Sequence, residues 1–497
     1  MPPASALASR KPTNTRHLRA VLAVPSVRRM SMETLRSKQS ATVLLRRENS
    51  STPQQMRNPN QRPQSTQISS LNRPAQAWVP GPQGGSTIRQ DPINQNDLRR
   101  SESWIWRLLL PRLERRLQQA QISRIEILLP GGSRLHLGQL RAEQPVPLVE
   151  LKHPQALVRG WFGGLMGWAE GYMAGDWSCR RLLRLTDWAM ANEQALEQAF
   201  GGTGLAAALH RLVHRLRPNS LRGSRRNIAS HYDLGNEFYR RWLDPSMTYS
   251  AALFDQPGLS LEQAQHAKNA KVIEWLEPGP GDRVLEIGCG WGGLAQQLSD
   301  NAIDGINYLG VTLSEEQLAW CRQRPIAHQQ NVAFELCDYR HLQQRYDRIV
   351  SIEMLEAVGE ANWPTYFNQL KQRLSDDGCA VIQVITIADQ RFASYRRGAD
   401  FIQRYIFPGG MLPSPCVFAQ QVERAGLQID RQLSFGPDYG STLNIWADHF
   451  ERAWPELQRL GFDQRFYRMW RYYLAYCESG FKSGSIDVQL YRLRHAN

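Results

Sequence analysis

The chain has 497 residues, a formal net charge of +14, seven cysteines and 42% hydrophobic residues. A chain of this length has room for two or three domains with a large buried core, and no apolar run approaches the roughly 20 residues of a membrane-spanning helix. The cysteines are scattered without a CxxC pair, so the sequence favours neither a disulfide framework nor a zinc or other metal site, and a reducing cytosol fits best.

The positive charge is concentrated at the N-terminus. Residues 1–100 contain 16 Lys and Arg against 4 Asp and Glu, which leaves the rest of the chain at about +2. An enzyme that binds nucleic acid is expected to carry its basic surface on the folded body. We therefore expect no nucleic-acid partner.

Residues 1–96 are rich in Ser, Pro, Gln, Asn and Arg and contain few aromatic residues. Such a segment cannot bury enough apolar surface to fold alone, so we expect a disordered basic tail. Its Arg-rich, acid-poor composition fits a targeting peptide, a tether for anionic lipids, or an over-long start in which Met30, Met32 or Met56 is the first residue. We expect the tail to be dispensable.

Residues 97–215 have the pattern of a small α+β domain, and we assign 216–228 to a linker. Residues 104–117 place apolar side chains at helical spacing with arginines between them. This pattern suits a helix at a membrane interface and equally the first layer of a domain core. Two short strands are predicted around Pro130-Gly131-Gly132, and helical runs continue to about Leu216. We expect this domain to be associated with lipid or membrane.

The segment 229–497 alternates strands and helices. Its predicted strands are the apolar runs 284–287, 308–314, 332–338, 346–353 and 379–387. Ser314 is expected to cap the helix that starts at Glu315. The alternation predicts a doubly wound α/β domain with a mostly parallel sheet, whose ligands bind beyond the carboxyl ends of the strands.

The centre of this domain is the stretch Val284-Leu285-Glu286-Ile287-Gly288-Cys289-Gly290-Trp291-Gly292-Gly293. An apolar strand runs into four glycines within six positions, a turn in which the backbone can approach a ligand closely. Glu286 lies inside the apolar strand, where a buried acid needs a polar partner or a ligand. The spacing GxGxGG differs from the dinucleotide fingerprint GxGxxG and resembles motif I of the S-adenosylmethionine (SAM) methyltransferases.

Further motifs follow in order over residues 229–490 and together resemble the cyclopropane-fatty-acyl-phospholipid synthase (mycolic acid cyclopropane synthase-like) family. They are His231-Tyr232-Asp233, Thr248-Tyr249-Ser250, Gly310-Val311-Thr312-Leu313-Ser314 with Gln317, Glu353 to Gly359, Tyr405 to Ser414, Asp438-Tyr439 with Thr442-Leu443, and Tyr473 to Glu478. Gly167 to Trp177 is similar to the N-terminal domain of that family. The resemblance implies a Rossmann-like SAM-dependent methyltransferase domain with a seven-stranded sheet.

The activity that the resemblance implies is transfer of the methyl(ene) carbon of SAM to the cis double bond of unsaturated acyl chains in membrane phospholipids, forming a cyclopropane ring. Such an enzyme works in the cytoplasm, peripherally at the inner face of the membrane, and a homodimer is possible. An isolated alkene is a weak nucleophile, and its methylation creates a carbocation. The site is therefore expected to be dry and apolar, with aromatic faces that stabilise positive charge.

The resemblance also implies residue roles. SAM is expected to be held by Tyr249, Ser250, Glu286, Ile287, Gly288, Cys289, Gly290, Trp291, Gly292, Gly293, Thr312, Leu313, Ser314, Gln317, Asp338 and Tyr339. Asp338 would lie beside the adenine, although a helix cap is the other interpretation of this residue. The candidate catalytic residues are Glu356, Tyr439 and Cys477, and packing within a C-terminal helix is the alternative for Cys477.

This sequence departs from the family at the residues that hold the general base of the reaction. Members of the family hold a bicarbonate ion with a Cys, a His, a Glu and a Tyr. Glu356 and Tyr439 match two of these ligands, whereas Ala251 and Ile385 replace the Cys and the His. The replacements argue against bicarbonate catalysis, and a differently placed base would allow a hydride shift that gives a methyl- or methylene-branched chain.

Three other functions compete with this interpretation. A small-molecule amine N-methyltransferase of related sequence is the first. The second is a lipid-binding module without catalysis, which the intact Glu286, Gly288, Gly290 and Gln317 argue against. The third is a nucleic-acid methyltransferase, which is disfavoured because no Asn/Asp-Pro-Pro-Tyr-type motif follows the fourth strand.

Overall fold

The computed structural model describes residues 104–141, 146–200, 234–301, 305–324, 326 and 331–496. All of them fall within one compact unit, Ile88–Asn497. The predicted tail, the predicted linker and the motif His231-Tyr232-Asp233 lie outside the described residues. Within the described ranges, no helix has both the length and the apolarity needed to cross a bilayer.

The described residues of the N-terminal part form helices α3 to α6 and a small sheet with strand order β2-β1-β3-β4. Its elements are α3 (Trp104–Gln119), β1 (Ile125–Leu128), β2 (Arg134–Leu137), β3 (Leu148–Leu151), α4 (Gln155–Ala174), β4 (Trp177–Ser178), α5 (Leu182–Ala191) and α6 (Glu193–Phe200). Strands β1 and β2 pair antiparallel around the predicted Pro-Gly-Gly turn. The apolar stripe of α3 (Trp106, Leu110, Leu113 and Leu117) is buried, which supports the core-layer interpretation of this helix.

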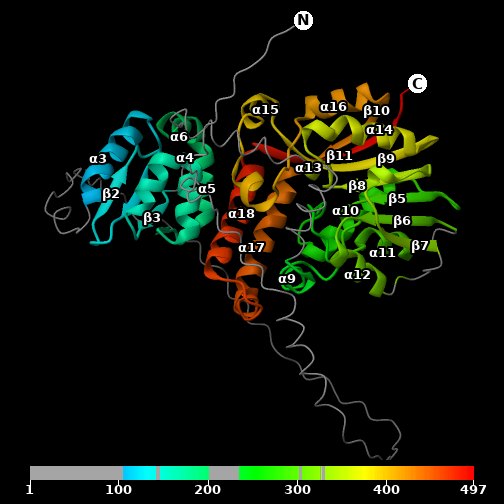
Figure 1. The fold of residues 1–497 in the computed structure, drawn as a ribbon, viewed down its shortest axis with the longest axis horizontal. Helices are drawn as coiled ribbons and strands as arrows, with labels where there is room; N and C mark the ends of the chain where they lie inside the picture. The colour runs from blue at the N-terminus through cyan, green and yellow to red at the C-terminus, as the bar shows by residue number, and fades with distance from the viewer. Residues whose placement is uncertain are drawn as a thin grey trace, which may run out of the picture. The chain divides into compact units, whose positions relative to one another are not determined.

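The C-terminal part is built on a seven-stranded sheet with strand order β10-β11-β9-β8-β5-β6-β7 (Figure 1). The strands are β5 (Arg283–Ile287), β6 (Asn307–Thr312), β7 (Val332–Leu336), β8 (Tyr346–Ile352), β9 (Leu374–Ile387), β10 (Leu427–Ser434) and β11 (Ile486–His495). Strands β5 to β9 pair in parallel, and β10 and β11 add an antiparallel edge. The predicted fold class is confirmed.

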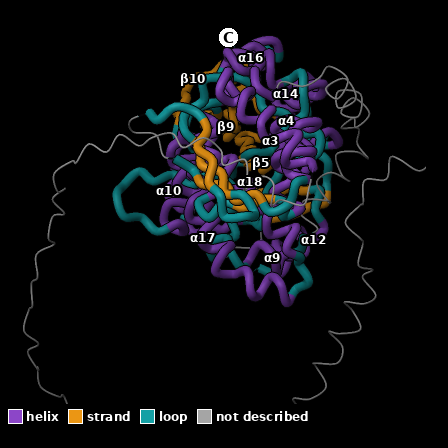
Figure 2. Tube along the Cα trace, turned by 90° about the vertical axis from the view of Figure 1, so that its left-hand side faces the viewer, coloured by secondary structure: helices purple, strands orange, loops and turns teal. Residues whose placement is uncertain are grey.

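Helices pack against both faces of this sheet, and its strands β5 and β9 are labelled near the centre of Figure 2. They are α9 (Asn236–Arg240), α10 (Leu261–Leu276), α11 (Gly293–Asp300), α12 (Glu315–Gln323), α13 (Leu355–Val358), α14 (Trp363–Arg373), α15 (Asp389–Tyr395), α16 (Pro415–Arg424), α17 (Gly436–Arg459) and α18 (Gln464–Lys482), with the short turns η2 (Tyr339–His341), η3 (Glu360–Asn362) and η4 (Ile402–Ile406). Ser314 caps α12 as predicted, because its Oγ accepts a 3.2 Å hydrogen bond from the Gln317 amide.

Two apolar cores cover the two faces of the sheet, because successive residues of a strand point to opposite faces. Val284 of β5 belongs to the core that contains residues of α10, α11, α17 and α18. Its neighbour Leu285 belongs to the core formed with α14 and α16. The central strands are therefore buried on both sides, which explains why their sequences are almost continuously apolar.

Helix α18 also packs against α4 and α5 of the N-terminal part. The Thr186 hydroxyl donates a 3.2 Å hydrogen bond to the Ala475 carbonyl, and the Ser479 hydroxyl donates a 2.6 Å hydrogen bond to Asp187. The helix that carries Cys477 is thus held between the two parts.

Candidate active site

The glycine turn after β5 adopts backbone angles that side chains disfavour. Gly288, Gly290 and Gly292 have φ values of 85°, 53° and 79°, in the left-handed region. A Cβ on Gly288 would lie 3.1 Å from Cγ of Met354, whereas the space around Gly290 is open within 4 Å. The amides of Gly288 and Cys289 both donate to the Val311 carbonyl, at 2.9 and 3.1 Å, which fixes the turn against β6. The turn thus exposes backbone to an open space.

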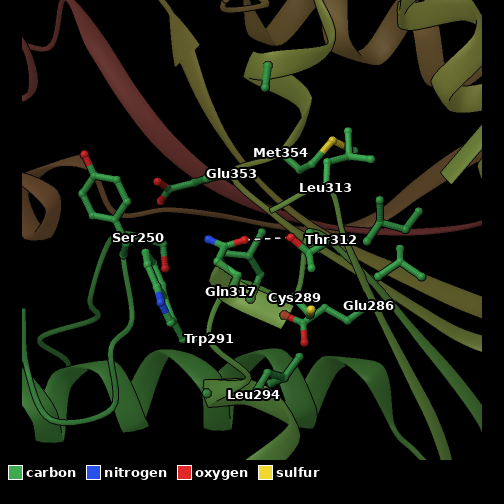
Figure 3. A pocket seen from close by; sticks show the side chains of 18 of the residues that line it. Ser250, Glu286, Cys289, Trp291, Leu294, Thr312, Leu313, Gln317, Glu353 and Met354 are labelled. Carbon is green, nitrogen blue, oxygen red and sulfur yellow. Dashed lines mark hydrogen bonds between the residues drawn. The ribbon is translucent and has the colours of Figure 1, made fainter. Parts of the chain in front are cut away.

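That space is a pocket at the carboxyl ends of β5, β6, β7 and β8, where the topology of the sheet predicts a ligand site (Figure 3). Of the predicted cofactor residues, the pocket is lined by Tyr249, Ser250, Glu286, Ile287, Gly288, Cys289, Gly290, Trp291, Gly293, Thr312, Leu313, Gln317, Asp338 and Tyr339. The other two have capping positions, Gly292 before α11 and Ser314 before α12. One pocket therefore gathers residues that are up to 90 positions apart in the chain.

The polar groups on the β6 side of the pocket are held in place by a short network. The Thr312 hydroxyl donates a 2.8 Å hydrogen bond to Oε1 of Gln317 and accepts one of 3.1 Å from the Ser314 amide. The amide group of Gln317 consequently presents its NH2 end away from Thr312, toward the pocket (Figure 3). An NH2 group in this position can donate to hydroxyl groups of a ligand.

Glu286 has the polar partner that its buried position requires. Its side chain accepts a hydrogen bond from the Tyr308 hydroxyl on β6, and both residues are 3% exposed. Burial raises the pKa of Glu286 to about 7, although the hydrogen bond from Tyr308 and the charge of Lys268 act in the opposite direction. Glu286 therefore changes its protonation state nearer to neutral pH than an exposed glutamate does.

Asp338 lines the pocket and also caps a helix, which is the alternative interpretation of this residue. Its carboxylate caps η2 by accepting a 3.0 Å hydrogen bond from the Arg340 amide. The Arg340 guanidinium also donates to it at 2.8 and 2.6 Å. Burial alone would raise the pKa of Asp338, but the hydrogen bonds from Arg340 outweigh burial and lower it.

Lys268 is a pocket residue that the sequence analysis missed. It belongs to α10, is 2% exposed, and donates a 3.1 Å hydrogen bond from Nζ to the Ser250 hydroxyl. Burial lowers the pKa of Lys268 to about 8, while Glu353, Glu286 and Asp244 favour its charged form. A buried ammonium group thus lies beside carboxyl groups on the pocket wall.

The chain is similar to known proteins in sequence and fold. A profile of the family described as mycolic acid cyclopropane synthetase matches residues 219–491. A tuberculostearic acid methyltransferase of Mycobacterium tuberculosis is 38% identical over 71% of this chain and 84% of its own length. A cyclopropane-fatty-acyl-phospholipid synthase of Escherichia coli is 35% identical over 69% of this chain and 86% of its own length. The chain belongs to the mycolic acid cyclopropane synthetase family.

A solved structure of this family agrees with the fold. Mycolic acid cyclopropane synthase CmaA1, complexed with SAH and CTAB, has a TM-score of 0.51 and 28% identity, covering 56% of this chain and 99% of that one. The resemblance inferred from the sequence is confirmed. As a member of the cyclopropane synthetase family, the chain is a SAM-dependent methyltransferase with SAM as its cofactor.

The catalytic residues that the family resemblance implied are spread around this site. Tyr439 comes from α17 and donates a 2.7 Å hydrogen bond to Oε2 of Glu353. Glu356 does not line the pocket; its Oε1 accepts a 2.6 Å hydrogen bond from the Ile385 amide, and its Oε2 has no partner among the described residues. Burial, followed by the charge of Glu353, raises the pKa of Glu356 to about 8, so Glu356 is protonated at neutral pH.

Cys477, the third candidate catalytic residue, lies on α18. Burial, followed by the charge of Asp400, raises the pKa of its thiol far above the ordinary value. The reactive form of a cysteine is the thiolate. Cys477 is therefore a thiol at neutral pH.

The bicarbonate set of the cyclopropane synthetase family is not reproduced here. Ala251 offers only its backbone amide, and that amide donates to Oε1 of Glu353 at 2.8 Å. Ile385 has no polar side chain, and its amide is taken by Glu356. The backbone amides at both replaced positions already donate to protein carboxyl groups, so the residues present do not fit a bound bicarbonate.

Proposed function

We propose that this enzyme transfers the methyl carbon of SAM to the cis double bond of unsaturated fatty acyl chains in membrane phospholipids. The names of the two relatives at 38% and 35% identity, a tuberculostearic acid methyltransferase and a cyclopropane-fatty-acyl-phospholipid synthase, both support an acyl substrate. SAM would be held by the glycine turn, by Thr312 and Gln317 on the β6 side, and by Asp338 and Tyr339 after β7. Bound there, SAM supplies an electrophilic sulfonium methyl group.

The observation that carries this proposal is the Tyr249 ring on the wall of the cofactor pocket, which is backed by buried aromatic residues of the core. Tyr249 lines the pocket, and its ring lies 5.4 Å from that of Tyr239, 5.6 Å from Trp242 and 5.2 Å from Trp446. Its hydroxyl is 2.9 Å from that of Tyr473. Aromatic faces exclude water and stabilise cations, which suits an alkene that becomes a carbocation better than it suits a polar amine.

The reaction balances without a further reagent. The alkene electrons form a new C–C bond to the methyl group while the C–S bond breaks, and the adjacent carbon becomes a secondary cation. Loss of a proton from the new methyl group closes a cyclopropane ring. A 1,2-hydride shift before proton loss gives a methylene branch instead, whereas a saturated methyl branch would need a reductant.

A methylene-branched product is the second candidate, and a specific observation favours it. Ala251 and Ile385 remove two ligands of the bicarbonate that serves as base in relatives, so proton removal must differ here. The relative at 38% identity is named for tuberculostearic acid formation and not for a ring. The position of the base relative to the cation decides which proton is lost.

Product analysis tests the proposed function. The full chain is incubated with SAM and vesicles of dioleoyl phosphatidylethanolamine, and the acyl chains and the headgroup are analysed separately by mass spectrometry. We expect one added carbon per modified oleoyl chain. A ring and a methylene branch have the same mass, so NMR separates them by the olefinic protons of the branch. Methylation of the amine headgroup with unchanged acyl chains would overturn the proposal in favour of an amine N-methyltransferase.

We further propose that the enzyme works peripherally at the cytoplasmic face of the membrane. Phe162 and Leu165 of α4 are 68% and 43% exposed, beside a kink at Gly164 with φ of 58°. Exposed apolar side chains at such a kink can insert into a lipid surface. Co-sedimentation of the double variant F162S/L165S with dioleoyl phospholipid vesicles should fall well below that of the unsubstituted chain, and equal sedimentation would refute this role of α4.

A further inference from the structure

The side chain of Glu353 is held by three hydrogen bonds from three different elements. Its Oε1 accepts 2.8 Å bonds from the Ala251 amide and from Nε2 of Gln383 on β9, and its Oε2 accepts the 2.7 Å bond from the Tyr439 hydroxyl. The residue lines the pocket directly after β8, and its carboxylate points toward the Ser250 side (Figure 3). A carboxylate is fixed on the wall of the cofactor pocket.

The backbone of Glu353 is strained in a way that a purely structural carboxylate does not require. Its φ is 51°, in the left-handed region that few residues other than glycine adopt, and its amide donates to the Gln383 carbonyl at 2.8 Å. Such a conformation is energetically unfavourable and persists where the surrounding structure imposes it, often at active sites. The strain directs the side chain into the pocket.

Two of the three donors to Glu353 belong to positions that hold bicarbonate in the family. Tyr439 is a shared family ligand, and the Ala251 amide belongs to the residue that replaces the family Cys. Here both donate to a carboxylate that belongs to the protein. A carboxylate and a bicarbonate ion present the same pair of oxygens to such donors, so one can take the chemical place of the other.

We propose that Glu353 is the proton acceptor of the reaction, in place of a bound bicarbonate. This inference rests on the proposed function, because it assigns the base that removes a proton from the acyl cation. The C–H electron pair becomes the new C–C bond of a ring or the C=C bond of a methylene branch, and the proton passes to Oε2 of Glu353. Oε2 accepts only one hydrogen bond, so a lone pair is left for the proton, and the Tyr439 hydroxyl and Gln383 amide hold the carboxylate in position.

Substitution of Glu353 in the full chain tests the inference. E353Q keeps the size of the side chain but cannot accept the proton, and we expect kcat on dioleoyl phospholipid vesicles to fall by about 100-fold or more. E353A removes the carboxylate and leaves its donors in place. Added bicarbonate or formate can then act as the missing base, and it should raise kcat of E353A at least about tenfold. The unsubstituted chain should work at the same rate in bicarbonate-depleted buffer.

The matched control is E360Q, the same chemical change seven residues further along. Glu360 forms an ion pair of 2.6 Å with Arg396 outside the pocket, so E360Q should keep the rate of the unsubstituted chain. SAM binding by calorimetry should be present in E353Q, which shows that the variant folds. A structural role would lower SAM affinity and kcat together, and small anions would not rescue it.

The inference is overturned if E353Q keeps kcat within about threefold, if bicarbonate or formate does not rescue E353A, or if bicarbonate depletion slows the unsubstituted chain. Failure of the proposed function looks different. In that case the unsubstituted chain adds no carbon to any acyl chain, although it binds SAM. The two failures are therefore distinguishable in one set of assays.

Discussion

The buried pair of Glu286 and Tyr308 allows a quantitative test of the electrostatics of the cofactor pocket. Y308F removes only the hydroxyl that donates to Glu286. Both side chains are 3% exposed, so water cannot replace the lost donor without rearrangement. The acid at the end of β5 is then left without its main neutral partner, next to the glycine turn.

The stability that Y308F is expected to lose depends on pH, because Glu286 titrates within the pH range in which unfolding can be measured. Burial raises its pKa from 4.5 to about 7, so the folded state binds this proton more tightly than the unfolded state. The contribution of the group to stability is therefore largest below about pH 4.5 and falls as the pH rises toward about 7. Y308F removes an interaction that lowers this pKa, so it extends the loss to higher pH.

The magnitude follows from the charge state of the acceptor. At pH 5.5 Glu286 is mostly neutral, and loss of a neutral hydrogen bond should cost about 1 kcal/mol. At pH 8.5 the unsubstituted protein carries a carboxylate there, and loss of a bond to a charged group should cost about 2–3 kcal/mol. For a domain of this size, that larger loss lowers Tm by roughly 4–10 °C.

Thermal unfolding followed by circular dichroism at pH 5.5 and 8.5 measures the difference. The control is Y346F on β8, which is separated from the strand of Tyr308 by β5. The Tyr346 ring is 4% exposed, and its hydroxyl has no hydrogen bond to a described residue. Y346F should change stability equally at both pH values. The proposed electrostatic role of the pair is wrong if Y308F lowers the free energy of unfolding by the same amount at both pH values, or by no more than Y346F does.

Three further predictions concern the pocket and the candidate catalytic residue Cys477. G310A would place a Cβ 2.9 Å from Cβ of Cys289, so we expect a loss of about 1–3 kcal/mol in stability and weaker SAM binding by calorimetry. T312V removes the hydroxyl that orients Gln317, and SAM affinity should fall roughly fivefold to tenfold, in line with one lost hydrogen bond. C477A should keep the rate of acyl methylation within about threefold, because a thiol with a strongly raised pKa is neither nucleophile nor base; a loss above about 100-fold in the vesicle assay would contradict this.

The fold could be predicted from the sequence because its signals are local. The apolar run before the glycines became β5, the hydroxyl of Ser314 capped α12, and the strands ended within one or two residues of the predicted positions where the motifs lie. Glycine spacing marked the turn, since positive φ values at Gly288 and Gly290 are what those residues permit. These are properties of a few consecutive residues.

Two pocket residues could not be predicted because their positions depend on packing between distant elements. Lys268 has the sequence context of an ordinary helical lysine, and only the packing of α10 against the 248–250 segment brings its ammonium group to Ser250. Glu353 and Glu356 stand three positions apart in one motif, and the resemblance selected Glu356. The sequence gives no sign of the left-handed backbone at Glu353, which turns that side chain into the pocket.

The residues that surround the proposed base Glu353 depend on one another physically, so their replacements have to be interpreted together. Only a donor-rich shell allows a carboxylate to stay ionised in a dry site, and here the donors are the Ala251 amide, Gln383 and Tyr439. A protein carboxylate and a bound bicarbonate compete for such donors, so a chain should carry one and not both. We therefore expect relatives with a Glu at the position of Glu353 to lack the Cys that Ala251 replaces, and relatives that retain this Cys to carry a residue without a carboxyl group at position 353.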